Sequence, residues 1–223
     1  MIKTGTVRLV AILLLAVLVL PLSSCNRSYN EQEVLENAET LLKKAEILNE
    51  VYYGKGIDYT TSGFADGYYY EANPIHLDKL GFSTIEELKN LTLETFTNGY
   101  ANQIFATKLN MIQDETGIQE MTRYYQKYDS INLVTPVCIM VYSKAKVMLK
   151  DDISYDYSTL SVSGVKRETV YVTVEATVVR DNGDSQKVTV KLDLIEEAYG
   201  WRIDNPCYVN YNDSLDKYKE LDN

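Results

Sequence analysis

The sequence has little of what catalytic sites are usually built from. Its 223 residues include one histidine, His76, and three cysteines, Cys25, Cys138 and Cys207. Because general acid–base catalysis near neutral pH most often relies on histidine, this scarcity disfavours an enzyme. The chain has no GxSxG, P-loop, CxxC or HExxH motif. We therefore expect no catalytic set, no metal site and no cofactor.

Basic residues are also in deficit, with 22 Lys and Arg against 32 Asp and Glu and a formal charge of −10. A nucleic-acid partner is not expected, because such a surface needs surplus positive charge to neutralise phosphates. With 4 prolines and 11 glycines there is no long low-complexity linker. The 45% hydrophobic and 24% charged content is ordinary for a globular chain and rules out a wholly disordered one.

The N-terminus carries an export signal. Two basic residues precede twelve consecutive apolar residues, Leu9 to Leu20. That length suits the core of a signal peptide and falls short of the roughly 20 residues that a membrane-spanning helix needs. The segment therefore predicts export and cleavage.

The residues that follow the apolar core, Leu22-Ser23-Ser24-Cys25, resemble the lipobox of bacterial lipoproteins. The resemblance implies a signal peptide over 1–24, a diacylglycerol and palmitate on Cys25, and a lipidated tether over 25–30. It places the protein at the outer face of the cell membrane, held by its lipid. The alternative is an ordinary secretory signal cleaved nearby, with Cys25 incidental.

The mature chain is expected to fold as one α+β domain over 31–212, followed by an acidic tail over 213–223. Apolar residues at three- and four-residue steps from Val34 to Tyr52 predict a long helix, which Asn30 can cap and Gly54 can end. A capping box, formed either by Thr84 with Glu87 or by Ser83 with Glu86, predicts a second helix, which Asn98-Gly99 would break. A third, short helix is expected over 100–108. Residues 55–82 are expected to be irregular or short strands, and 110–120 a loop.

The second half of the chain alternates apolar and polar residues, which predicts strands. They are expected near 122–128, 131–149, 153–163, 170–178, 188–194 and 201–204. Asp181-Asn182-Gly183-Asp184 predicts a tight hairpin between two of them, because Asn-Gly accepts positive φ at both central positions.

The order of these elements, with Thr84-Ile85-Glu86-Glu87-Leu88-Lys89, Phe96-Thr97 and Tyr100-Ala101, resembles exported lipoproteins of Gram-positive bacteria with a nuclear transport factor 2-like (NTF2-like) domain. The resemblance implies N-terminal helices packed on a curved, mostly antiparallel C-terminal sheet, the NTF2-like cone. The chain also resembles, more weakly, the IseA-type inhibitors of cell-wall DL-endopeptidases.

Tyrosine is unusually frequent, with 19 residues, some of them in clusters such as Tyr68-Tyr69-Tyr70 and Tyr124-Tyr125. A tyrosine ring combines a large apolar area with a hydroxyl, which suits faces that bind sugars or peptides. The alternative is the ordinary preference of tyrosine for strands. Within Asp66–Glu71, we take Tyr68, Tyr69 and Tyr70 as candidate ligand-binding residues.

Three other residues are candidates for a site. His76 lies in an expected loop, where Asp66 or Asp78 could orient it as a base or ligand contact, and the alternative is an ordinary surface histidine. Cys138 and Cys207 could form one disulfide in an oxidising compartment. A buried free thiol is the alternative for Cys138, which lies in an apolar run.

The sequence favours a membrane-anchored, non-catalytic protein that binds a cell-envelope component or a small ligand, with a cell-wall or envelope protein as a further candidate partner. One alternative is an inhibitor of a cell-wall endopeptidase, with Asp151-Asp152 or Asp181–Asp184 as a protruding acidic loop. Another is a small NTF2-like enzyme that uses His76 beside an acid in the mouth of the cone.

Overall fold

The computed structural model describes residues 29–110, 112–114, 117–119, 122–147, 151–180 and 182–207. The fold below is that of the compact unit that begins at Glu31. The expected signal peptide, Cys25 and the acidic tail lie outside the described residues. In the part of the chain that is described, no helix is long and apolar enough to cross a membrane.

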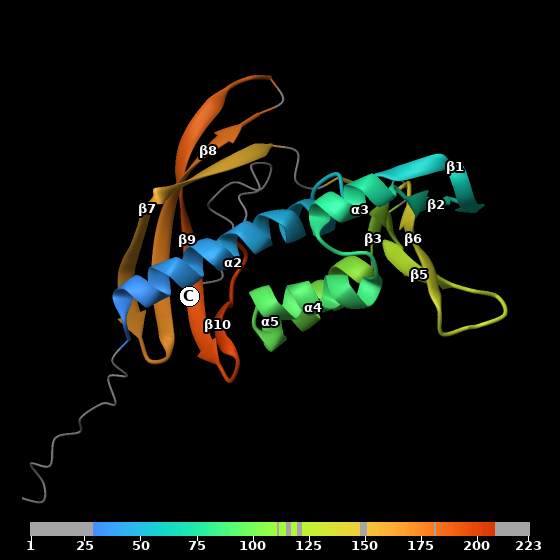
Figure 1. The fold of residues 1–223 in the computed structure, drawn as a ribbon. Coiled ribbons are helices and arrows are strands. Elements are labelled where there is room, and N and C mark those ends of the chain that lie inside the picture. The colour runs from blue at the N-terminus through green and yellow to red at the C-terminus, as the bar shows by residue number, and fades with distance from the viewer. Residues whose placement is uncertain are drawn as a thin grey trace, which may run out of the picture. The chain divides into compact units, whose positions relative to one another are not determined.

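The first long helix, α2 (Glu31–Tyr52), forms where the sequence predicts it (Figure 1). Its apolar residues recur at the helical period, so they fall on one side of the helix and are buried there. The buried apolar residues are Val34, Ala38, Leu41, Leu42, Ala45, Leu48, Val51 and Tyr52. Just beyond the helix, the N–H of Gly54 donates to the carbonyl oxygens of Asn49 and Glu50, both at 3.1 Å.

The stretch 55–82, predicted to be irregular or short strands, contains two strands and a helix. β1 (Tyr59–Asp66) and β2 (Tyr69–Ala72) pair antiparallel, with a register shift between Thr60 and Ala65. A short helix, α3 (Pro74–Leu80), follows them.

The prediction that His76 lies in a loop was wrong, because the residue sits in α3. Asn73 caps this helix, since its Oδ1 accepts the N–H of Ile75 at 3.0 Å. Pro74 supplies the fixed φ that suits a first helical turn. Gly81, with a φ of 79°, ends the helix after seven residues.

The next helix, α4 (Ile85–Thr95), begins at the predicted capping box. Thr84 Oγ1 accepts the N–H of Glu87 at 3.1 Å, and the Glu87 carboxylate accepts the N–H of Thr84 at 3.2 Å. Both donors would otherwise be unpaired at the helix start, so the box fixes where α4 begins.

The third helical segment starts earlier than predicted. α5 (Asn98–Ile104) continues into a π-helical turn, η1 (Phe105–Leu109). Asn98 and Gly99 lie in its first turn and do not break the chain between helices. The two helices are separated at Phe96, which ends α4, and Thr97, which begins α5. Thr97 caps α5, since its Oγ1 accepts the N–H of Tyr100 at 3.3 Å.

Among the described residues, two four-stranded sheets and a small hairpin make up the β part (Figure 1). Sheet 1 has the order β1-β2-β6-β5 and includes β5 (Tyr124–Tyr128) and β6 (Pro136–Tyr142). Sheet 2 has the order β10-β9-β8-β7, formed by β7 (Asp152–Lys166), β8 (Thr169–Val179), β9 (Ser185–Glu197) and β10 (Gly200–Ile203). The hairpin is β3 (Ile112–Asp114) with β4 (Gly117–Gln119). The strands within each sheet pair antiparallel, so the protein is α+β.

These pairings correct three expectations. The strands form two sheets where one curved C-terminal sheet was expected. Sheet 1 combines β1 and β2, which precede α3 in the chain, with β5 and β6, which follow all the described helices. The stretch 110–120, expected to be a loop, contains β3 and β4. Within the predicted strand 131–149, which the structure describes as far as residue 147, the strand observed is β6. Alternation along a strand reports which face is buried, but it does not say which strands pair.

The β8–β9 hairpin turns where the sequence predicts it. Val179 pairs with Ser185, and the N–H of Gly183 donates to the carbonyl oxygen of Arg180 at 2.8 Å. Gly183 has a φ of 84°, the left-handed conformation that the turn requires at this position.

α2 and α4 both join the two sheets, and α4 does so by contacting β5 and β10. α2 contacts β7 and β10 of sheet 2 as well as α4. Beyond its last turn, Arg123 donates to the carbonyl oxygens of Tyr52 at 2.6 Å and Gly54 at 2.8 Å, and the Tyr124 hydroxyl donates to that of Val51 at 2.7 Å. Sheet 1 is therefore fixed to the end of α2 through the start of β5.

Candidate functional site

The three candidate tyrosines are distributed over both faces of sheet 1. Tyr70 stacks on Tyr59 of the neighbouring strand, with ring centroids 5.2 Å apart. Tyr69 points to the opposite face, as adjacent strand residues must. Tyr68, beside the β1–β2 turn, lies with Tyr69, because both rings contact Tyr142. The structure therefore brings two of the three residues to one surface.

That surface carries more tyrosines than the sequence run supplies. Tyr69 lies 5.0 Å from Tyr125 of β5 and 5.1 Å from Tyr142 of β6, measured between ring centroids. Tyr68 meets Tyr142 edge to face at 6.4 Å. Such offset and edge-to-face contacts stabilise aromatic clusters. We call this cluster, together with Phe64, the tyrosine face.

The tyrosine face is polar as well as aromatic. The Tyr69 hydroxyl donates to the carbonyl oxygen of Thr122 at 2.6 Å, and the Tyr125 hydroxyl donates to Asp66 Oδ2 at 3.4 Å. Burial raises the pKa of both tyrosines, and the nearby Asp66 carboxylate raises the pKa of each further. Both hydroxyls therefore stay protonated near neutral pH and keep their hydrogen-bonding capacity.

Two lysines contact the rings that are most open to solvent. Lys144 lies 5.6 Å from the Tyr68 ring, and Lys127 lies 3.7 Å from the Phe64 ring. Tyr68 is 59% exposed and Phe64 is 48% exposed. A surface of half-exposed rings with hydroxyls and charges of both signs can stack on a flat apolar ligand and hydrogen-bond its edges.

A Ser-x-x-Lys spacing lies beside this face, at Ser143 and Lys146. It follows β6 in a turn and not in a helix. The Ser143 hydroxyl donates to the carbonyl oxygen of Tyr68 at 2.8 Å, so its contact is with the backbone of the β1–β2 turn. The Ser143 hydroxyl therefore helps to position Tyr68.

His76 lies apart from the pocket that its helix lines. Its Nδ1 accepts the backbone N–H of Asp58 at 2.8 Å and is 3.4 Å from the Asp58 carboxylate. Because Nδ1 is an acceptor here, the neutral ring carries its proton on Nε2. This contact ties α3 to the residue before β1, which is a structural role.

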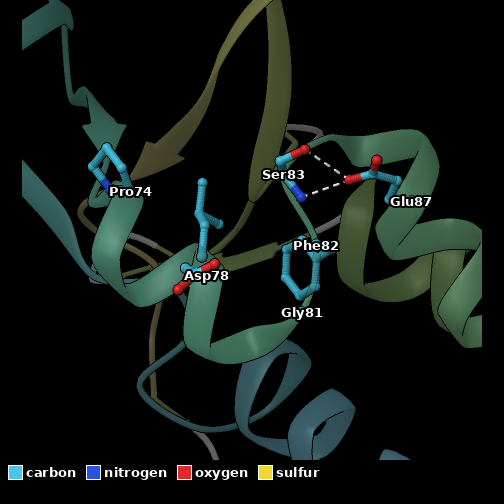
Figure 2. Close-up of a pocket in the computed structure, with 7 residues that line it drawn as sticks. Pro74, Asp78, Gly81, Phe82, Ser83 and Glu87 are labelled. Atoms are coloured by element: carbon cyan, nitrogen blue, oxygen red, sulfur yellow. Dashed lines mark hydrogen bonds between the residues drawn. The ribbon is translucent and has the colours of Figure 1, made fainter.

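An open pocket of about 470 Å³ lies between α3 and α4 (Figure 2). Its lining residues are Pro74, Leu77, Asp78, Gly81, Phe82, Ser83 and Glu87. Figure 2 shows the Glu87 carboxylate turned to Ser83, from which it accepts the backbone N–H at 2.6 Å and the hydroxyl at 2.8 Å. These bonds lower the pKa of Glu87. The carboxylate is thus occupied by the capping box of α4 and not aimed at the pocket.

Both described cysteines are free, so the disulfide considered between Cys138 and Cys207 is not formed. Cys207 is buried and accepts from Asn49 of α2 at 3.7 Å, and burial raises its pKa to about 12. Cys138 is half-buried in β6 beside Met140, and burial raises its pKa as well. Both thiols therefore stay protonated at neutral pH, which makes them poor nucleophiles.

Among the described residues, no group of three or more His, Cys, Asp and Glu side chains could hold a metal ion. Comparison with protein-family models, with curated proteins and with solved structures finds no match to this chain. The candidate site is accordingly defined by the geometry of sheet 1.

Proposed function

We propose that this protein is a lipid-anchored, extracytoplasmic binding protein without catalytic activity, and that its tyrosine face binds a component of the cell envelope. The observation that carries the binding role is the convergence of Tyr68, Tyr69, Tyr125 and Tyr142 on one side of sheet 1. Clustered, partly exposed tyrosines are typical of surfaces that recognise ligands. The lipobox sequence ending at Cys25 supports the location.

The ligand class follows from the chemistry of the face. Flat rings favour the apolar faces of sugars or the backbone of an extended peptide, and the hydroxyls and the Asp66 carboxylate favour polar edges. Lys127 and Lys144 add positive charge beside the rings. Peptidoglycan offers sugars, peptides and carboxylates together, so it is the probe that suits this surface.

Within this proposal, α2 with sheet 2 corresponds to the NTF2-like part of the fold. Its support is the helix lying against β7 and β10, and the bridge between Phe96 and Ile203 that joins the end of α4 to β10. Sheet 1 then stands as an addition that presents the tyrosine face.

The two alternative functions have less support. An enzyme using His76 needs the ring beside an acid in a cavity, whereas His76 does not line the α3–α4 pocket. An endopeptidase inhibitor with an acidic protruding loop is not favoured at Asp152, which begins β7, and Asp181 lies outside the described residues.

The binding role is tested by sedimentation with purified, insoluble peptidoglycan. The double variant Tyr68→Ala, Tyr125→Ala removes two rings of the face and is expected to weaken co-sedimentation by roughly tenfold or more. Tyr171→Ala is the matched control, because Tyr171 in sheet 2 also lies under a lysine, Lys191, at 4.7 Å. Equal binding by the wild type, the double variant and Tyr171→Ala would contradict the tyrosine face as the site. Hydrolysis of the peptidoglycan would contradict a non-catalytic role.

The location is tested separately on the protein extracted from native membranes. Mass spectrometry of its N-terminal fragment is expected to show a mature chain that begins with an acylated Cys25. Cys25→Ala should leave the chain unprocessed. An unmodified thiol on a full-length N-terminus in the cytosol would overturn the anchored location.

A further inference from the structure

The loop between β5 and β6 exposes an unusual amount of apolar side chain. Ile131 is 94% exposed, Leu133 73% and Val134 79%. No charged residue occurs between Ser130 and Val137. Three aliphatic side chains this exposed on one short loop are costly in water and mark a contact surface.

This loop is held in shape by its own polar groups. The Asp129 carboxylate accepts the N–H of Ile131 at 2.7 Å and of Asn132 at 2.8 Å. The N–H of Asp129 donates to the carbonyl oxygen of Thr135 at 2.9 Å, and the N–H of Thr135 donates to that of Asn132 at 3.0 Å. These bonds satisfy much of the loop backbone without water, which is the condition for placing it in an apolar medium.

We propose that the β5–β6 loop, residues 129–135, inserts its three aliphatic side chains into the outer surface of the bilayer, as a second membrane contact beside the lipid on Cys25. The inference rests on the proposed lipid anchor. It adds an orientation, because two contacts fix how the domain lies on the membrane. The several acyl chains expected on Cys25 already anchor stably, so orientation is what the second contact supplies.

The short tether argues for lipid as the occupant. Five residues separate Cys25 from Glu31, so an anchored chain keeps the start of α2 within about 20 Å of the lipid headgroups. The 22-residue helix α2 is about 33 Å long, and its far end contacts β5 at Tyr124. The tether and α2 together limit how far β5 and its loop can lie from the lipid, with which a protein partner would have to compete.

The charge of the loop region indicates which lipids it meets. The loop has no lysine or arginine, its base carries Asp129, and the chain has a formal charge of −10. Insertion is therefore driven by apolar burial, and anionic headgroups oppose it. Phosphatidylcholine vesicles should bind the loop better than vesicles that contain phosphatidylglycerol.

The test uses the full chain extracted from membranes and reconstituted into phosphatidylcholine vesicles. Ile131→Trp places an indole at the loop tip, while the native Trp201 is buried and serves as the internal reference. With brominated acyl chains, the introduced indole is expected to shift to the blue and lose roughly half its emission, because interfacial insertion brings it to the acyl boundary. Tyr199→Trp is the control, since Tyr199 is 91% exposed on the β9–β10 turn and should not be quenched.

The outcomes separate the inference from the function on which it rests. Protein that stays in the supernatant overturns the anchor, and with it the insertion. Protein that sediments with vesicles but shows no quenching for Ile131→Trp overturns the insertion alone. Tip-dependent self-association, seen as a dimer that Leu133→Ser abolishes, would identify a second copy as the occupant and also overturn the proposal.

Discussion

The two sheets differ in the side chains that they bury and expose, and that difference separates structural support from binding surface. In sheet 2, β8 and β9 pair without interruption from Thr169↔Ile195 to Val179↔Ser185, and every second residue of β8 is buried. In sheet 1, the pairing of β1 with β2 and of β5 with β6 is interrupted by register shifts, and rings cluster on both faces. Register shifts also interrupt the pairing of β7 with β8 in sheet 2, so the sheets differ in their side chains and not in regularity. The apolar residues of β8 are buried on one face, whereas sheet 1 leaves partly exposed rings that can meet a ligand.

The largest expected effect is on the stability provided by sheet 2. Leu192→Ala removes a fully buried side chain from β9 and should lower the free energy of unfolding by about 3 kcal/mol. The matched change Leu133→Ala, at an exposed leucine of the β5–β6 loop, should alter it by less than about 0.5 kcal/mol. Urea unfolding followed by circular dichroism measures both, and similar losses would contradict the division between support and contact surface.

A second prediction concerns how each sheet is fixed to the helices. Arg123→Met, at the start of β5 in sheet 1, leaves the carbonyl oxygens of Tyr52 and Gly54 without this donor. It should lower the free energy of unfolding by about 2 kcal/mol. Arg202→Met in sheet 2 removes a bond to the carbonyl oxygen of Leu93 at 2.9 Å from a less buried site, and should cost about 1 kcal/mol. The same unfolding experiment compares them. A larger loss for Arg202→Met would show that sheet 2 depends more on its helix contacts.

The sequence predicted sheet 2 better than sheet 1, and the reason is local. The alternation of Val170, Val172 and Val174 and the Asn182-Gly183 turn define a hairpin from neighbouring residues alone. Sheet 1 pairs β2 with β6, which joins Tyr69 to Tyr142 across the intervening helices. No local pattern reports such a pairing, so the second sheet and its order were not foreseen.

The same limit applies to the candidate site. The run Tyr68-Tyr69-Tyr70 identified one strand of it, and period-two alternation correctly implies that the rings divide between faces. Tyr125 and Tyr142 could not be assigned to that surface, because their neighbours come from distant strands. The position of His76 was predicted wrongly for a different reason. The helix α3 is short, and its start signal, Asn73-Pro74, lies among glycines that favour a loop.

A smaller effect compares one partly buried tyrosine hydroxyl from each sheet. Tyr155→Phe in sheet 2 removes a bond to the carbonyl oxygen of Cys207 at 2.7 Å and should cost about 1.5 kcal/mol. Tyr69→Phe in sheet 1 removes the bond to Thr122 and should cost about 0.5 kcal/mol, because the site is open enough for water to replace the donor. Unfolding measurements on both variants test this. Peptidoglycan binding should fall only for Tyr69→Phe.

The smallest effect distinguishes the two regions by the sign of their pH dependence. Burial raises the pKa of Glu46, which accepts the Tyr157 hydroxyl where α2 meets β7, whereas Ser83 lowers the pKa of Glu87 beside sheet 1. The charged Glu46 is disfavoured by folding, so Glu46→Gln should stabilise the protein at neutral pH, and the gain should disappear as the pH falls below the ordinary glutamate value of 4.5.

Glu87 behaves in the opposite way. Its carboxylate favours folding above the ordinary pKa, and that contribution is lost as the pH falls through its lowered pKa. Glu87→Gln, which keeps a capping side chain but removes the charge, should therefore destabilise the protein at neutral pH and approach the wild type in acid. Both changes should stay below about 1 kcal/mol because neither carboxylate is fully buried. The free energy of unfolding of each variant is measured from pH 3 to pH 8, an interval of about 5 units around the glutamate range. Its difference from the wild type, plotted against pH, should give two curves of opposite slope. Parallel curves would mean that the two carboxylates experience the same environment.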